Sequence, residues 1–227
     1  VRRIGFQLSA QLLEREMRIA QGTIETSLSA LKNGIGFNVA GGTHHAGSNW
    51  GEGFCLLNDQ AIAANYLLRE SLASRIILVD LDVHQGNGTA EIFKNQPNVF
   101  TFSIHGQKNF PFRKEISDLD IGLEDGIGDR DYLDILQTNL RKAFDDFKPD
   151  FAFYLAGADV LETDKLGKLA LSTQGCLERD EIVFSMCKTH QVPVPVSMGG
   201  GYSPGINNIV NAHCNTFKAR LTTFFYR

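Results

Sequence analysis

Residues 76–88 constrain the fold of this chain more than any other stretch. They begin with an apolar run at 76–79 and end in carboxylates, an imidazole and glycines. An apolar run closed by a turn is typical of a buried parallel strand, and ligands bind beyond the carboxyl ends of such strands. Asp80, Asp82 and His84 alternate, so we expect them on one strand face. Burying these groups together is costly without a positive partner, and a metal ion is the simplest one.

The remaining chain alternates strand-like runs with helical patterns. We expect strands at 35–39, 76–79, 99–104, 151–156 and 192–198, and helices at 6–32, 59–68, 89–94, 131–147, 173–189 and 206–219. Gly22 is a candidate break in the first helix, Asp129 or Asp131 a candidate N-cap, and 107–129 and 160–172 are expected loops. This order predicts a three-layer α/β/α fold with a mostly parallel sheet, built as one domain over residues 1–227.

The composition excludes several classes of protein. The chain is 43% hydrophobic and 21% charged, with a net charge of -4 and no basic stripe, which argues against nucleic-acid binding. Its apolar runs are too short to span a membrane. The four cysteines are scattered, and we interpret them as reduced core residues. We therefore expect an intracellular protein, cytoplasmic or, in a eukaryote, nuclear.

Four of the predicted strands end in polar or glycine-rich loops. Because parallel strands place these loops at one edge of the sheet, we expect a single site to collect them. The loops carry His44-His45, the group Asp80/Asp82/His84, Asp159, and residues 199–202.

Asp82, His84 and Asp159 offer oxygen and nitrogen ligands without sulfur. Three protein ligands with an open position are typical of a catalytic metal, which would polarise a carbonyl and activate water. For Asp159 alone, a helix N-cap or a loop hydrogen bond remains an equal alternative.

The other loops offer proton-transfer groups. Either His44 or His45 could act as a base and then as an acid, although adjacent histidines also occur in solvated loops. Asp80 could orient and charge one imidazole, and Asn87 could accept from the other. Tyr202 follows three glycines without the Lys-Ser/Thr of a phosphate loop, so we interpret it as a donor to an oxyanion or, alternatively, as a core tyrosine.

These segments together resemble the zinc-dependent histone deacetylase family, which has the arginase-deacetylase fold. They follow the family's order, and the stretches 82–88 and 164–169 look most like its class IV branch and bacterial histone deacetylase-like amidohydrolases. The matching blocks are 41–47, 53–59, 80–88, 156–159 and 199–202.

The resemblance implies a role for each catalytic residue. Asp82, His84 and Asp159 would bind one Zn²⁺. His45 would be the general base and then the acid, and His44 would help electrostatically. Tyr202 would bind the carbonyl oxygen.

The resemblance also implies two supporting sites. Asp80 would be the partner of His44, and it would hold K⁺ together with Asp82 and Ser103. A tunnel for the acyl-lysine stem would have Phe54 and Phe110 as its walls. The other expected substrate-binding residues are Gly53 in the wall, Leu166 at the rim, and Gly200.

Two departures from the family pattern have consequences. Many relatives have Asp where this chain has Asn87, so we expect a lower pKa for His45 here. The family usually has several tens of residues before the segment that matches Val1, so we expect a catalytic domain that is short at its N-terminus.

The predicted reaction is hydrolysis of an N-acyl amide, most simply an Nε-acyl-lysine. A two-manganese ureohydrolase is disfavoured, because Gly86 and Leu161 stand where a second metal would need Asp. An amidohydrolase acting on acetylpolyamines, and an inactive acyl-lysine-binding fragment, remain open.

Overall fold

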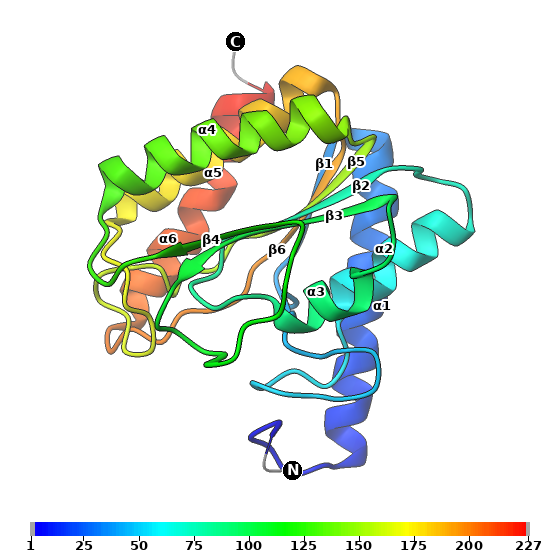
Figure 1. The fold of residues 1–227 in the computed structure, drawn as a ribbon, viewed down its shortest axis with the longest axis horizontal. Helices are drawn as coiled ribbons and strands as arrows, with labels where there is room; N and C mark the ends of the chain where they lie inside the picture. The colour runs from blue at the N-terminus through cyan, green and yellow to red at the C-terminus, as the bar shows by residue number, and fades with distance from the viewer. Residues whose placement is uncertain (1–2, 226–227) are drawn as a thin grey trace.

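A six-stranded, all-parallel sheet forms the centre of the computed structural model, which describes residues 3–225 (Figure 1). The strand order is β1-β6-β5-β2-β3-β4, and every neighbouring pair is parallel. The strands are β1 (Ile35–Asn38), β2 (Ile76–Asp80), β3 (Val99–Gly106), β4 (Leu119–Leu123), β5 (Phe151–Leu155) and β6 (Val194–Ser197).

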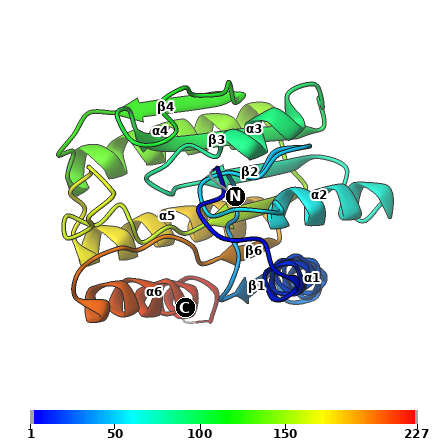
Figure 2. The same cartoon turned by 90° about the horizontal axis from the view of Figure 1, so that it is seen from below.

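Helices cover both faces of this sheet, which confirms the predicted three-layer fold (Figure 2). One face carries α1 (Ala10–Asn33), α2 (Asp59–Arg69) and α3 (Asn87–Phe93). The other face carries α4 (Asp129–Phe147), α5 (Thr173–His190) and α6 (Ile206–Arg220), followed by the π-helical turn η1 (Leu221–Phe225). Within residues 3–225, no helix is long and apolar enough to cross a membrane.

The two faces of β2 explain its continuous apolar sequence. Ile77 and Val79 pack into the cluster that includes side chains of α4, α5 and α6. Ile76 and Leu78 pack into a second cluster with side chains of α1 and α2. A strand that is buried on both faces needs apolar residues at every position, so its pattern does not alternate.

The first helix differs from its prediction at two points. It begins at Ala10 rather than at residue 6, because the side chain of Ser9 accepts the backbone N–H of Leu12 at 3.0 Å and caps the helix there. The predicted break at Gly22 is wrong, since α1 continues through it. A Cβ on Gly22 would lie 3.2 Å from Nδ2 of Asn38, so this glycine allows a close contact instead.

Two expectations for the segment 107–131 are wrong. The predicted loop contains the edge strand β4, which pairs with β3 on one side and alternates between more and less exposed residues. The N-cap of α4 is Gly128 rather than Asp129 or Asp131. Asp129 lies in the first turn, where its carboxylate accepts the backbone N–H of Ser172 at 2.8 Å and so joins α4 to the start of α5.

Candidate active site

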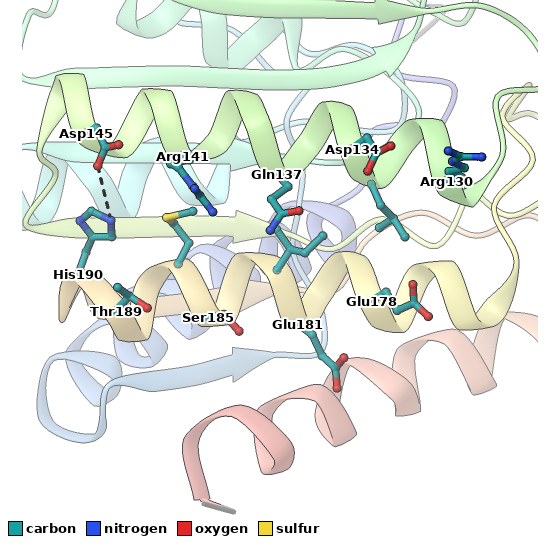
Figure 3. A pocket seen from close by; sticks show the side chains of 13 residues that line it. Arg130, Asp134, Gln137, Arg141, Asp145, Glu178, Glu181, Ser185, Thr189 and His190 are labelled. Atoms are coloured by element: carbon teal, nitrogen blue, oxygen red, sulfur yellow. Dashed lines mark ion pairs between the residues drawn. The ribbon is translucent and has the colours of Figure 1, made fainter.

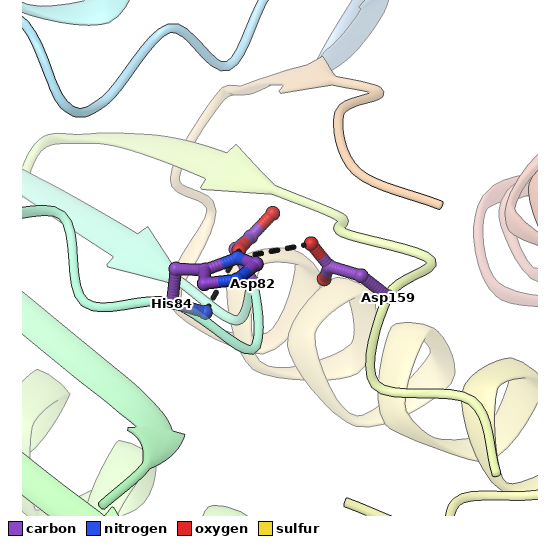
Figure 4. Close-up of side chains that lie close together, drawn as sticks. All are labelled: Asp82, His84 and Asp159. Carbon is purple, nitrogen blue, oxygen red and sulfur yellow. Dashed lines mark hydrogen bonds and ion pairs between the residues drawn. The ribbon is translucent and has the colours of Figure 1, made fainter. Parts of the chain in front are cut away.

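Three buried side chains from two neighbouring loops form a potential metal site (Figure 4). Asp82 and His84 follow β2, Asp159 follows β5, and these strands pair in the sheet. One ligand atom from each residue lies within 4.8 Å of the others. The sheet topology therefore brings together residues that are far apart in the sequence.

The loop after β2 differs from the predicted strand face. The strand ends at Asp80, and Asp82 and His84 lie beyond it. The backbone N–H of Asp82 donates to Oδ1 of Asp80 at 3.1 Å, and that of His84 donates to Oδ1 of Asp82 at 2.8 Å. These bonds turn the chain so that Asp82 and His84 face Asp159, while Asp80 contacts His44.

The charges of the three residues fit a bound cation. Nδ1 of His84 lies 2.9 Å from Oδ1 of Asp82 and 3.3 Å from Oδ2 of Asp159. Burial lowers the pKa of His84, but its contacts with the carboxylates of Asp159 and Asp82 outweigh burial and raise it to about 10. Burial and the charge of Asp82 raise the pKa of Asp159 to about 7.

Asp159 shows most directly that the donor set fits a metal. Its Oδ1 accepts the backbone N–H of Val83 at 3.0 Å, which matches the loop hydrogen bond considered as the alternative. Its Oδ2 is buried and accepts no hydrogen bond within residues 3–225, and its contact with Nδ1 of His84 at 3.3 Å is an ion pair only. A buried carboxylate oxygen without a donor is costly, and a cation bound by Asp82, His84 and Asp159 would satisfy it.

His44 and His45 are buried, so the solvated-loop alternative is wrong. Nδ1 of His44 lies 2.6 Å from Oδ2 of Asp80. Burial lowers the pKa of His44, but the charges of Asp80 and Asp82 raise it to about 9, which favours the imidazolium form of His44 at neutral pH. Burial and the positive charge of His44 hold the pKa of His45 well below its ordinary value.

The tautomer of His45 follows from its contact with Asn87. Nδ1 of His45 lies 2.7 Å from Oδ1 of Asn87, and Nδ2 of Asn87 donates to Glu52 at 3.1 Å. Because the amide nitrogen faces Glu52, the amide oxygen accepts from His45, whose Nδ1 then carries the proton. This leaves Nε2 of a neutral His45 as a basic atom.

A cavity of about 760 Å³ extends from the metal cluster to the surface. Its ring walls include Phe110, whose centroid lies 4.9 Å from that of His45. A Cβ on Gly53 would lie 2.6 Å from Cδ2 of His45, so only glycine fits there. All five predicted substrate-binding residues line the cavity: Gly53, Phe54, Phe110, Leu166 and Gly200.

Tyr202 lines the same cavity and is 38% exposed, so the core-tyrosine alternative is wrong. Partial burial and the negative charges of Asp82 and Asp159 raise the pKa of its phenol. The hydroxyl therefore stays protonated at neutral pH and can donate a hydrogen bond. Gly200, two residues before Tyr202, has φ +67°, and a Cβ there would lie 2.6 Å from Oδ2 of Asp159.

Residues 5–217 match the histone deacetylase domain family. The chain belongs to the histone deacetylase family. It is 48% identical over 218 residues to an uncharacterized protein of Picosynechococcus sp.. This match covers 96% of the present chain and 73% of that protein. It is 31% identical over 184 residues to Histone deacetylase 2 of Arabidopsis thaliana, covering 80% of this chain and 48% of that protein.

Solved structures of the family's fold superpose well on this chain. The HDA15 HD domain matches with a TM-score of 0.76 and 26% identity, covering 89% of this chain and 62% of that one. Acetylpolyamine aminohydrolase from Burkholderia pseudomallei matches with a TM-score of 0.77 and 23% identity, covering 90% and 62%. The chain thus spans about three fifths of each of these two structures.

Two of the three residues predicted to bind K⁺ lie side by side on neighbouring strands. Asp80 and Ser103 are register partners on β2 and β3. The hydroxyl of Ser103 lies 3.0 Å from Nδ1 of His105. Potassium binding by Asp80, Asp82 and Ser103 stays a prediction.

Gly86 and Leu161 stand where a second metal would need carboxylates, and neither position can provide one. A Cβ on Gly86 would lie 2.3 Å from Oδ2 of Asp80, so this position has no room for a carboxylate. Leu161 is buried in the apolar cluster. In the described part of the chain, the only group of three or more His, Cys, Asp or Glu residues that could hold a metal ion is Asp82, His84 and Asp159.

Sequence reasoning gave no role to three carboxylates that support the site. Glu52 accepts from Asn87, and Asp164 accepts the backbone N–H of Tyr202 at 2.5 Å. Asp59 accepts the backbone N–H groups of Gly42 and Thr43, just before the two histidines. Each carboxylate accepts hydrogen bonds from residues that are distant in the sequence, so no local pattern marks it. The only sequence signal for Asp59 was its place in the matched block 53–59.

A second groove, of about 690 Å³, lies between α4 and α5 (Figure 3). All thirteen of its lining residues belong to these two helices. They include the ion pair between His190 and Asp145, at 4.0 Å. The groove is therefore separate from the strand ends that form the site.

Proposed function

We propose that this histone deacetylase-family chain hydrolyses Nε-acyl-lysine amides with one Zn²⁺ held by Asp82, His84 and Asp159. One observation carries the proposal: a single cavity collects this cluster, a neutral His45 and the phenol of Tyr202. Its ring walls of Phe54 and Phe110 suit an unbranched alkyl stem. The motif resemblance favours the class IV branch, and K⁺ at Asp80 is part of the proposal.

The residues of the chain account for the proton transfers. Zn²⁺, when bound, would polarise the amide carbonyl and acidify water. Nε2 of His45 removes a proton from the attacking water, whose oxygen bonds to the carbonyl carbon. The phenol of Tyr202 donates a hydrogen bond to the resulting oxyanion. His45 then gives its proton to the amine nitrogen as the C–N bond breaks, which releases lysine and a carboxylate.

His44 has a different part in this mechanism. Its Nδ1 lies 2.6 Å from Oδ2 of Asp80, and its raised pKa favours the protonated form, which makes it a poor base at neutral pH. Its positive charge lies beside His45 and lowers the pKa of that base. His44 therefore contributes electrostatic stabilisation to the site.

The test is turnover of a fluorogenic acetyl-lysine peptide by the purified chain with Zn²⁺. We expect Tyr202→Phe to lower kcat by about 10²–10³-fold, since the oxyanion loses one donor. His45→Ala should lower it by about 10²–10⁴-fold. Equal turnover by wild type and both variants would overturn the proposal.

A substrate panel then separates the classes of amide. It compares acetyl-lysine, longer acyl-lysine and acetylpolyamine substrates at equal concentration. We expect acyl-lysine peptides to have the highest kcat/KM. A higher kcat/KM for acetylpolyamines would assign the chain to small-molecule amide hydrolysis.

A further inference from the structure

A guanidinium lies buried next to the loops that carry the metal cluster. Arg179 belongs to α5 and is 2% exposed. Arginine is almost never buried so completely unless its charge is paired and its N–H groups are bonded. Its partners therefore indicate what this burial serves.

Two of those partners are backbone carbonyls beyond the ends of two strands. Nη1 of Arg179 donates to the carbonyl of Gly157 at 2.7 Å and to the carbonyl of Leu81 at 3.3 Å. Leu81 directly precedes Asp82, and Gly157 lies two residues before Asp159. One nitrogen atom thus joins the loop after β2 to the loop after β5.

These two loops are in close contact and carry like charges. A Cβ on Gly157 would lie only 2.7 Å from Cα of Asp82. The carboxylates of Asp82 and Asp159 repel each other. The last backbone bond between the two strands, from the N–H of Leu81 to the carbonyl of Leu155 at 3.2 Å, precedes both carboxylates. A direct bond between the loops runs from the N–H of Val83 to Oδ1 of Asp159. The side chain of Arg179 adds a second connection, to one backbone carbonyl in each loop.

The other contacts of Arg179 fix the direction of Nη1. Nε and Nη2 both lie 2.9 Å from Oδ1 of Asp180, which also accepts the hydroxyl of Tyr154. The guanidinium lies 6.0 Å from the centroid of the Tyr154 ring. Because the guanidinium is a rigid planar fork, this anchoring aims Nη1 at the two carbonyls. A lysine ammonium is a point charge on a flexible stem and cannot reproduce the arrangement.

Core stability alone does not require this ion pair, because apolar residues of similar volume are often as stable as a buried pair. We infer that Arg179 is a positioning residue that sets the spacing of the Asp82 and Asp159 loops, and through it the affinity for the metal ion. This inference rests on the proposed function through the metal site alone and is independent of the substrate.

The experiment measures Zn²⁺ affinity by competition with a chelator, using the full chain. The variants are Arg179→Lys and Arg179→Met. The matched control is Tyr132→Phe, because the Tyr132 hydroxyl is buried nearby and has no hydrogen-bond partner within the described chain. The absorption spectrum of the Co²⁺ form reports the ligand geometry, and the melting temperature of the metal-free protein reports stability.

We expect both Arg179 variants to bind Zn²⁺ about 10–100-fold more weakly, the range for partners that orient ligands. Their Co²⁺ spectra should change, while Tyr132→Phe keeps the wild-type affinity and spectrum. Affinity within threefold of wild type in Arg179→Lys would overturn the inference. An equal loss in Tyr132→Phe would also overturn it, since general core packing would then be the cause.

Two further outcomes are decisive. If both Arg179 variants fail to fold while Tyr132→Phe folds, Arg179 is a stability residue and the inference is wrong. It is also wrong if the wild-type chain binds no Zn²⁺. A wild type that binds Zn²⁺ but hydrolyses no acyl-lysine overturns the proposed function and leaves the affinity comparison valid.

Discussion

Asn87 determines which nitrogen of His45 is basic, and it does so without a charge. Its amide oxygen accepts from Nδ1 of His45, and its amide nitrogen donates to Glu52. Glu52 also pairs with Arg3 at 3.2 Å. A carboxylate therefore lies one hydrogen bond farther from the base than it would if position 87 carried an aspartate.

Asn87→Asp should raise the pKa of His45, because a carboxylate stabilises the imidazolium more than an amide does. His45 acts as a base only when neutral, so a higher pKa moves the acidic limb of the pH–rate profile to higher pH. We expect a shift of about one unit or more. The measurement is kcat/KM against pH, and an acidic limb that stays in place or moves down contradicts the prediction.

Glu52→Gln provides the control for that shift. In Asn87→Asp, the new carboxylate would face Glu52 across a contact that is now 3.1 Å. Like charges at this distance disfavour each other, so the double variant should isolate the effect of the introduced carboxylate on His45. The acidic limb of the double variant should still lie above that of Glu52→Gln.

The contacts of single residues divide into those that sequence predicts and those that it does not. The pairs His44–Asp80 and His45–Asn87 were predictable because each partner lies in a motif at a strand end. Arg179 was not predictable, since its bonds go to backbone carbonyls 98 and 22 residues away, and a carbonyl has no sequence signature.

At the scale of elements, the start of α2 holds the loop that carries both histidines. Oδ1 of Asp59 accepts the N–H groups of Gly42 and Thr43 at 3.0 and 2.8 Å, and also the hydroxyl of Thr43. Oδ2 accepts the hydroxyl of Thr23 from α1 at 2.6 Å. One carboxylate thus joins α1, α2 and the loop after β1.

Asp59→Ala should lower kcat/KM by about 10²-fold, the cost of misplacing a catalytic group by roughly 1 Å. Zn²⁺ affinity should change by no more than a few-fold, because the proposed metal ligands lie on the loops after β2 and β5. Steady-state kinetics and chelator competition measure the two quantities. Ser197→Ala is the control, since it removes only one contact to Asp59, at 3.3 Å. A large loss of Zn²⁺ affinity in Asp59→Ala would contradict this division of roles.

The edge strand β4 was not predicted, and its pairing explains why. Strands buried on both faces, such as β2, have continuous apolar sequences that are easy to recognise. The edge strand β4 pairs on one side only, and it contains Asp120 and Gly122, which favour a loop. Its existence depends on the pairing with β3 rather than on its own pattern.

For the molecule as a whole, the proposed metal site would add one link between segments that hydrogen bonds already connect. Its proposed ligands come from two loops at the carboxyl edge of the sheet, and His44 and His45 come from a third. A metal ion bound only by the folded chain stabilises it by mass action. Zinc binding and global stability should therefore be coupled.

Zn²⁺ at 100 times its dissociation constant should stabilise the fold by about 2.7 kcal/mol, which raises the melting temperature by about 5–10 °C in a chain of this size. The measurement is thermal unfolding after chelator treatment, with and without added Zn²⁺. His84→Ala is the control, and its melting temperature should barely respond. The thiol of Cys214 is exposed and offers a competing Zn²⁺ ligand outside the cluster. An equal rise in wild type and His84→Ala would therefore place the stabilising metal away from Asp82, His84 and Asp159.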